Sequence, residues 1–405
     1  MRVVNGAVPK SIRGIYYKVG PAWRSHDLPI HPFDGDGYVT KIQFNDGEVH
    51  FQGRYISKAT KKARAFSGPL FSLAGLENPS NTNIIPWGTN KLIAFYEGGA
   101  PRVIQEDTLE TVEGLEGFKD GWPLETGSNW LDGFLRDQGI IGDCINAHPK
   151  MTDEGLLLMR LAYRWNMIEG IVTHITFYTA NIDNKIIKTE NVNISGFVYM
   201  HDFMKVDGYD DDMDCYAFFH HPLKFCWGTG IATSLTNDDN GITVLYICGG
   251  DIVKKVRVPN KCFTTHHVSA KIRKNVLEIF TICYPGYLQG EGRLVRMLVD
   301  LENEELIEHR VINNNWLEFP VISDDGRIYM SAFGCKHVIS GEPVLMQDGE
   351  NTYVSVMCYK VQEKKTVLMI FNAELDQICE LEFPCAYIPI GLHGAFTTRP
   401  FASDV

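Results

Sequence analysis

Hydrophobic and polar residues alternate along most of this chain in short runs, and turn residues separate one run from the next. Examples are the runs at 38–44, 156–163, 277–284 and 366–371. Short segments rich in Val, Ile, Tyr and Phe, bounded by Asn-Asp-Gly or Asp-Asn turns, are typical of antiparallel strands joined by hairpins. Hardly any stretch sustains the period of an amphipathic helix. The pattern therefore predicts an all-β protein with many strands.

The number of strands favours a β-propeller over a small β-sandwich. No WD or kelch repeat is recognisable, so this expectation rests on strand number and not on a repeat. No Pro- or Ser-rich linker divides the chain, which predicts a single domain over residues 1–405. The segments 60–83 and 115–135 interrupt the strand pattern, and long loops in compact folds are usually functional lids or caps. They supply aromatic candidates for lining an apolar tunnel: Phe66, Phe71, Trp122, Trp130 and Phe134.

Charge and cysteine usage narrow the class of protein. Lys and Arg number 38 against 50 Asp and Glu, a net charge of −12 that argues against a nucleic-acid partner. The ten cysteines are scattered singly, as expected of reduced thiols and not of a disulfide framework. The first residues lack the apolar stretch of a secretory signal, and no apolar run approaches the ~20 residues of a membrane-spanning helix. We expect a protein that is not secreted, with the cytoplasm or a plastid as its compartment.

Thirteen histidines are present, and a histidine taken singly is more often structural than a metal ligand. Four lie in strand-like contexts with distinctive neighbours: Ala147-His148-Pro149-Lys150, Met200-His201-Asp202-Phe203, His266-His267-Val268-Ser269-Ala270 and Leu392-His393-Gly394-Ala395-Phe396. In a propeller the inner strands face a common axis, so histidines far apart in sequence can converge there. Four neutral imidazoles suit Fe(II), Cu, Zn or Ni, and their spacing does not select one of these metals.

Several blocks of sequence, taken in order, resemble the carotenoid cleavage oxygenases. No single block is specific, but the series covers nearly the whole chain. The blocks are Val8-Pro9 through Gly20-Pro21, Phe33-Asp34-Gly35-Asp36-Gly37 followed by Arg54-Tyr55-Ile56, AHPK at 147–150, MHDF at 200–203, CFTTHHVSA at 262–270, LEFP at 317–320 with GRIY at 326–329, and LHGAF at 392–396.

The resemblance implies a seven-bladed β-propeller with Fe(II) on its axis and loop or cap segments over the iron face. It implies that four histidines bind the metal, with positions left open for O₂: His148, His201, His266 and His393. In the third block His266 occupies the ligand position of the family, and the alternative is His267, which would point to the opposite face of a strand. It also implies three glutamates that accept hydrogen bonds from the ligand imidazoles: Glu97, Glu318 and Glu342. The alternative for each is a solvated surface glutamate.

The activity implied is Fe(II)-dependent cleavage of a carbon–carbon double bond of a carotenoid or apocarotenoid, with O₂ as co-substrate and two carbonyl products. A retinoid isomerase of the same family would keep the same histidines and glutamates. A stilbene-cleaving member would carry Lys where Tyr96 stands. A metal-free binding propeller would have lost at least one ligand, and none is lost.

Two departures from the family pattern are visible. The third block continues Ser269-Ala270-Lys271 where the family has Asn-Ala-Tyr, and the chain is short between Glu342 and His393. The expected partner is a lipophilic small molecule, with no obligate protein partner evident. The apolar run at 69–76 has two interpretations, a rim that contacts a membrane peripherally or a buried packing segment.

Overall fold

A computed structural model describes residues 1–23, 33, 35–56, 79–97, 101–112, 144–166, 170–183, 185–208, 214–225, 235–250, 252–258, 262–333, 338–348, 351–385 and 388–398. These residues form thirty β-strands and no α-helix, which confirms the all-β expectation. In this part of the chain there is no helix of the length and hydrophobicity needed to cross a membrane. The segments 60–78 and 115–135, with the aromatic residues named above and the apolar run at 69–76, lie outside the described residues.

The strands form eight sheets, all with antiparallel pairing between neighbouring strands. The first three, in chain order, are β30 (His393–Thr397), β2 (Gly14–Ala22), β3 (Asp36–Asn45) and β4 (Glu48–Tyr55); β5 (Asn83–Pro86), β6 (Lys91–Phe95) and β7 (Arg102–Gln105); and β8 (Cys144–Ile145), β9 (Lys150–Thr152), β10 (Gly155–Asn166), β11 (Gly170–Ala180) and β12 (Ile186–Ser195). The next two are β13 (Met204–Lys205), β14 (Tyr216–His220), β17 (Thr243–Gly249) and β18 (Ile252–Val258), with the separate pair β15 (Leu223–Phe225) and β16 (Leu235–Asn237).

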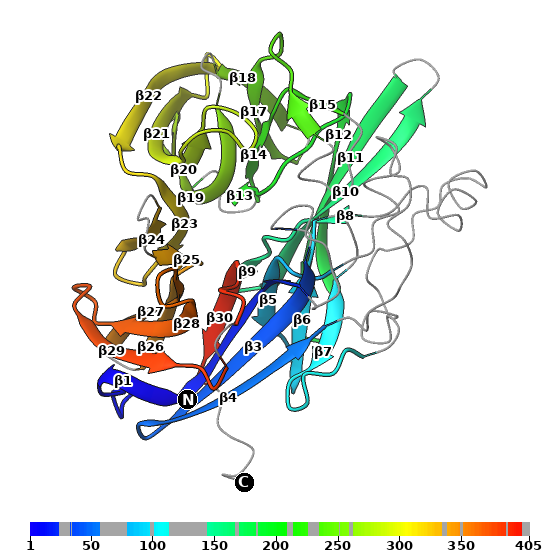
Figure 1. The fold of residues 1–405 in the computed structure, drawn as a ribbon. Helices are drawn as coiled ribbons and strands as arrows, with labels where there is room; N and C mark the ends of the chain where they lie inside the picture. Colours follow the sequence, from blue (N-terminus) through cyan, green and yellow to red (C-terminus); the bar gives the residue numbers. More distant parts are fainter. Residues whose placement is uncertain are drawn as a thin grey trace.

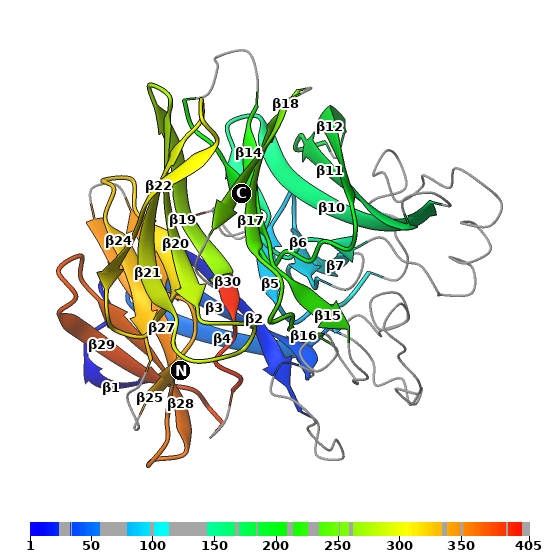
Figure 2. The same ribbon diagram turned by 90° about the horizontal axis from the view of Figure 1, so that it is seen from above.

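The remaining sheets complete the chain. They are β19 (Phe263–Arg273), β20 (Val276–Tyr284), β21 (Arg293–Asp300) and β22 (Glu305–Asn313); β23 (Leu317–Ile322) and β24 (Ile328–Ala332); and β25 (Val338–Ser340), β26 (Val344–Asp348), β27 (Asn351–Lys360), β28 (Lys365–Phe371), β29 (Gln377–Glu382) and β1 (Arg2–Gly6). Figure 1 shows the sheets following one another around the molecule in chain order, and Figure 2 shows the same succession from above.

Neighbouring sheets pack face to face, and the alternation of side chains along each strand makes this possible. On β2, Ile15, Tyr17 and Val19 join a buried cluster with residues of β5, β6 and β7. Tyr16, on the opposite face of the same strand, packs in a cluster with residues of β26, β27, β28 and β29. Because both faces of β2 are buried, even Lys18 on this strand has no exposed surface. The hydrophobic pattern thus packs the sheet of β2 between two neighbouring sheets.

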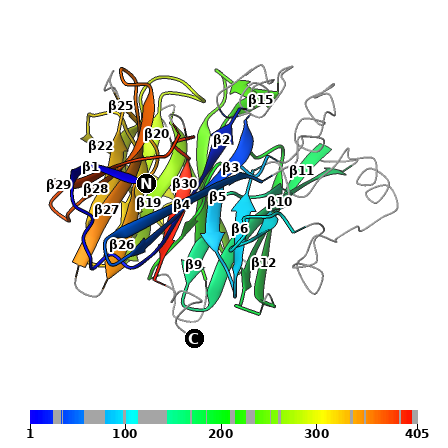
Figure 3. The same ribbon diagram turned by 60° about the horizontal axis from the view of Figure 1, so that its bottom comes forward.

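The two ends of the described chain are tied into shared sheets. Strand β30, near the C-terminus, pairs with β2, with His393 opposite Val19 and Gly394 opposite Lys18. Strand β1 pairs with β29 in a second such sheet. Figure 3 shows both arrangements, with red strands lying beside blue ones.

Tight packing at Gly394 gives a test of this arrangement. A Cβ added there would lie 2.2 Å from the carbonyl oxygen of Tyr17, a backbone atom that cannot move aside. We expect Gly394→Ala to destabilise the protein by about 1–3 kcal/mol, the usual cost of overpacking, and to lower the Tm. A Gly394→Ala protein as stable as wild type in thermal unfolding would contradict this description of the close pairing between β30 and β2.

One expectation about cysteine is wrong. The structure joins Cys262 and Cys283 in a disulfide across the start of β19 and the end of β20. The sequence hides this pairing because the two residues are 21 positions apart and only the hairpin register brings them together. Elsewhere in the described residues, Cys215, Cys248, Cys358 and Cys379 are buried free thiols and Cys385 is an exposed one.

Candidate metal centre

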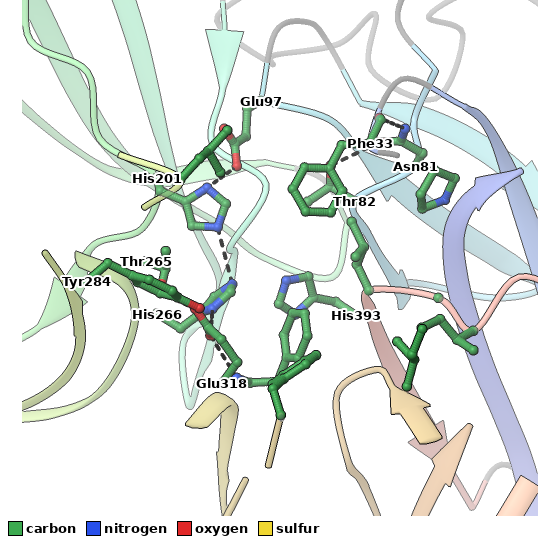
Figure 4. Close-up of a pocket in the computed structure, with 18 of the residues that line it drawn as sticks. Phe33, Asn81, Thr82, Glu97, His201, Thr265, His266, Tyr284, Glu318 and His393 are labelled. Carbon is green, nitrogen blue, oxygen red and sulfur yellow. Dashed lines mark hydrogen bonds and ion pairs between the residues drawn. The ribbon is translucent and has the colours of Figure 1, made fainter. Parts of the chain in front are cut away.

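Four histidines from four different sheets meet in the interior. His148 lies between β8 and β9, His201 lies just before β13, His266 is on β19, and His393 begins β30. The ring centroids of His148 lie 4.6 Å from His201, 5.0 Å from His266 and 4.7 Å from His393, and those of His266 and His393 are 4.9 Å apart. Figure 4 shows the rings of His201, His266 and His393 turned toward a common centre.

Three glutamates contact the Nδ1 atoms of three of these imidazole rings. Glu97, just after β6, pairs through Oε1 with Nδ1 of His201. Glu318 on β23 accepts a hydrogen bond from Nδ1 of His266 at 2.5 Å, and Glu342, between β25 and β26, accepts one from Nδ1 of His393 at 2.9 Å. Each glutamate comes from a sheet that contributes none of the histidines. The seven residues expected at the site are therefore brought together.

The glutamates are ionised, and this fixes the tautomer of each imidazole. Burial acts to raise the pKa of Glu318, but His266, Thr265 and the amide of Phe319 together outweigh it and hold the pKa at about 2. Burial also acts to raise the pKa of Glu97 and that of Glu342, but the facing histidines, His201 and His393, outweigh it, and both pKa values are lowered. A carboxylate that accepts from Nδ1–H leaves the lone pair of Nε2 free.

The Nε2 atoms of three of the histidines lie so close together that a cation between them would stabilise the arrangement. Nε2 of His148 lies 3.1 Å from Nε2 of His201, which lies 3.2 Å from Nε2 of His266. Lone pairs at this separation repel unless a proton or a metal ion lies between them. Two imidazole nitrogens bound at a right angle to one ion, at the ~2.1 Å typical of zinc, lie about 3.0 Å apart. Burial and the neighbouring imidazoles hold the pKa of His148 well below its usual value, so this ring is a neutral donor. The donor set therefore fits a metal ion.

His267, the alternative to His266, is turned away from this cluster. Its Nδ1 is 2.8 Å from the hydroxyl of Thr281, and its ring stacks on Phe219 at 5.6 Å. Its Nε2 and its backbone amide contact Asp202, the residue after His201. His267 thus braces the segment that carries His201.

Several supporting residues were not anticipated from the sequence. Asp202, almost fully buried, forms an ion pair with Lys150 at 2.7 Å and so links the segments that hold His201 and His148. The hydroxyl of Tyr199 donates to Glu97 at 2.8 Å, and that of Thr265 donates to Glu318 at 2.5 Å. Buried Lys18 donates to the carbonyl oxygen of Glu342 at 2.6 Å. Most of these residues lie within two positions of a histidine at the site, which is the only signal the sequence offers.

A cavity of about 880 Å³ opens onto the histidines. Its wall includes His201, His266 and His393, and it is otherwise largely aromatic: Trp23, Phe33, Tyr96, Tyr199, Phe263, Tyr284, Tyr287, Trp316, Phe319, Phe333 and Tyr359. The volume lies near the upper end of the ~300–1,000 Å³ usual for small-molecule sites. The cavity is therefore suited to a large apolar ligand.

Phe319 reaches the centre of this wall through an unusual backbone conformation. Its φ is +56°, in the left-handed region that costs a non-glycine residue about 1–3 kcal/mol, and the pairing of β23 with β24 is irregular at this point. The ring lies 5.2 Å from His266 and 5.3 Å from His393. The turn thus places an apolar ring beside the imidazoles of His266 and His393, while Glu318, the preceding residue, accepts a hydrogen bond from His266.

Comparisons with known proteins give one matching family profile and several relatives. The family profile described as retinal pigment epithelial membrane protein matches residues 1–343. The apocarotenoid-15,15'-oxygenase of Synechocystis sp. is 26% identical over 387 residues, covering 84% of this chain and 74% of that protein. The chloroplastic carotenoid cleavage dioxygenase 7 of Oryza sativa is 27% identical, covering 51% and 41%, and the resveratrol cleavage oxygenase 1 of Botryotinia fuckeliana is 28% identical, covering 49% and 35%.

Solved structures extend the likeness to the fold. A crystal structure of cobalt-substituted Synechocystis apocarotenoid oxygenase superimposes with a TM-score of 0.75 over 98% of this chain and 95% of that one. A Trp149Ala mutant of the same oxygenase also gives 0.75, over 97% and 94%. Sequence identity is 20% in both cases. The fold is therefore shared, although the sequences have diverged widely.

Proposed function

This chain belongs to the family described as retinal pigment epithelial membrane protein, and we propose that it is an Fe(II)-dependent dioxygenase. Its substrate is a carotenoid or apocarotenoid, and it cleaves one carbon–carbon double bond to give two carbonyl products. The names of the relatives support both the reaction and the lipophilic substrate. The chloroplastic relative supports a plastid as one of the two expected compartments.

One observation carries the proposal: four imidazoles lie together, and the three that buried carboxylates orient also line a large aromatic cavity. Four neutral nitrogen donors and no anionic ligand leave a metal ion with its charge little reduced and with positions free. The assigned ligands are His148, His201, His266 and His393, and the assigned carboxylate partners are Glu97, Glu318 and Glu342.

Bound Fe(II) would supply the activation of O₂. The protein itself orients the metal ligands and the substrate and keeps water out of the cavity. The carboxylates hold the rings of His201, His266 and His393 in one tautomer and one orientation. The aromatic wall holds a conjugated alkene by apolar contact, and Phe319, beside His266 and His393, limits how closely it approaches. The hydroxyls of Tyr199 and Thr265 donate hydrogen bonds to Glu97 and Glu318. These polar groups of the cavity wall therefore already have partners when an apolar substrate binds beside them.

We also infer one seven-bladed propeller domain. Eight sheets are described, and setting aside the isolated pair β15–β16 leaves seven. Each of the seven contributes or adjoins one residue of the site, four by a histidine and three by a glutamate. Seven sheets that each present one residue to a shared centre support seven blades around an axis.

Product identification tests the function. The iron-loaded protein is incubated under ¹⁸O₂ with a panel of carotenoids, apocarotenoids and stilbenes, and products are analysed by mass spectrometry. We expect two carbonyl fragments from a carotenoid or apocarotenoid, each labelled with one ¹⁸O. Isomerised but uncleaved substrate would instead identify an isomerase, and cleavage confined to stilbenes would contradict the inference drawn from Tyr96.

A further inference from the structure

A second group of metal-binding side chains lies in the sheet β19–β22. Cys262 directly precedes β19, Cys283 is on β20 and His309 is on β22. One potential ligand atom from each of the three lies within 4.8 Å of the other two. None of the three lines the cavity above the histidine cluster. The group is therefore separate from the proposed iron centre.

The environment of this group is apolar, and one of its donors has no use in the fold. Cys262 and Cys283 are 3% and 8% exposed and belong to a buried cluster with Val295 and Met297. Nε2 of His309 is buried and has no hydrogen-bond partner among the described residues. Leaving such a nitrogen unsatisfied costs free energy, so it is a candidate for a ligand that the fold itself does not provide. Burial also lowers the pKa of His309, which keeps the imidazole neutral and its lone pair available.

We propose that Cys262, Cys283 and His309 form a zinc site when the two cysteines are reduced. Two thiolates and one imidazole are a donor set that zinc binds in proteins, with a fourth position left to water. Charge favours Zn²⁺ over Cu⁺, because two thiolates and Zn²⁺ make a neutral group whereas two thiolates and Cu⁺ carry a net negative charge. A net charge is costly in an apolar cluster.

The disulfide and the zinc ion are alternatives at one place. In the oxidised state Cys262 and Cys283 are joined to each other and offer no thiolate. A dithiol reductant transfers two electrons and two protons to the pair, and the reductant itself becomes a disulfide. Zinc then binds the two sulfurs and displaces the two thiol protons to solvent. A reducing compartment therefore favours the metal-bound state.

The experiment uses the full chain, already loaded with iron. Protein reduced with a phosphine and protein left oxidised each receive a small excess of ZnCl₂, and unbound metal is removed by gel filtration. Zinc and iron are counted by mass spectrometry, and the zinc environment is measured by X-ray absorption. We expect about one zinc per reduced chain, with two sulfur neighbours at about 2.3 Å, and none in the oxidised chain. Iron content should be the same in both.

Three variants assign the ligands. Cys262→Ser and Cys283→Ser should each lose the zinc, and His309→Ala should bind it at least tenfold more weakly, since even residues behind a ligand change metal affinity by about 10- to 100-fold. Cys385→Ser is the matched control, because Cys385 is an exposed free thiol outside this cluster, and it should bind zinc as wild type does. Circular dichroism and retained iron show that each variant is folded.

The X-ray absorption result stands without any variant and decides the proposal if one of them fails to fold. Zinc surrounded only by nitrogen and oxygen would overturn it, as would equal zinc in reduced and oxidised protein. Zinc that displaces iron one for one, with no sulfur neighbours, would place the ion on the four histidines and also overturn it. None of these readings depends on cleavage activity.

Discussion

His201→Ala is expected to abolish both iron binding and substrate cleavage. His201 is the central member of the cluster, since its Nε2 lies within 3.2 Å of the Nε2 atoms of both His148 and His266. Its removal leaves three imidazoles, a poorer and more labile site for Fe(II). It also leaves the buried carboxylate of Glu97 with only the hydroxyl of Tyr199 as a hydrogen-bond donor among the described residues. The variant should hold less than about a tenth of the wild-type iron after gel filtration, because loss of a ligand should cost at least as much as the ~10- to 100-fold lost on changing a residue behind one.

Three further histidine variants sharpen this test. His50→Ala is the control, because the side chain of His50 is 71% exposed on β4 and should not affect iron. His266→Ala should lose iron, whereas His267→Ala should keep it, because the ring of His267 faces Thr281 and Phe219. Metal analysis by mass spectrometry gives the answer. Stoichiometric iron and full turnover in His201→Ala would remove the proposed ligand set.

Glu318→Gln is expected to yield a folded protein with about 10- to 100-fold lower iron affinity or turnover. The carboxylate accepts from three donors at once: Nδ1 of His266, the hydroxyl of Thr265 and the amide of Phe319. Gln keeps the size and one acceptor oxygen, but it loses the negative charge that polarises the imidazole N–H. The amide NH₂ group of Gln would also face one of the groups that now donate to the carboxylate, and two donors cannot form a hydrogen bond with each other. The loss should therefore appear at the metal before it appears in stability.

The control for this variant is Glu278→Gln on β20. Glu278 is partly buried and is paired with Arg296 at 2.6 Å, but it does not line the cavity. Removing its charge tests what the loss of an ion pair away from the cavity does to stability, and the effect should be small. Equilibrium iron titration and initial rates are compared for both variants. A Glu318→Gln protein that matches wild type in both measurements would show that the carboxylate does not act on the metal.

The strands were predictable because the residue pattern records burial directly. On β4, for example, every second side chain is exposed, and the sequence shows the same alternation. The positions of the seven site residues came from resemblance to a family, since neither the gaps between the histidines nor their neighbours fix a shared centre. Geometry then distinguished His266 from its neighbour, because adjacent residues on β19 point to opposite faces.

What the sequence did not predict depends on contacts between distant segments. The pairing of Cys262 with Cys283 requires the register of β19 and β20, and the approach of His309 requires two further strands of the same sheet. The burial of Lys18 follows from packing on both faces of β2, whereas lysine in a sequence ordinarily indicates a surface. In each case, contacts with segments distant in the sequence determine the environment of the side chain, and the residue type alone does not reveal them.

The pairing of β30 with β2 has a consequence for the order in which the metal centre can assemble. His393 is the first residue of β30, so this imidazole reaches the others only when the two strands have joined. A nascent chain that ends at residue 392 carries only three of the four proposed ligands, because the fourth, His393, has not yet been added. Retention of the metal should therefore depend on the pairing of β30 with β2. A metal ion held by His393 and the other three histidines would in turn stabilise this pairing, because it binds only the folded state.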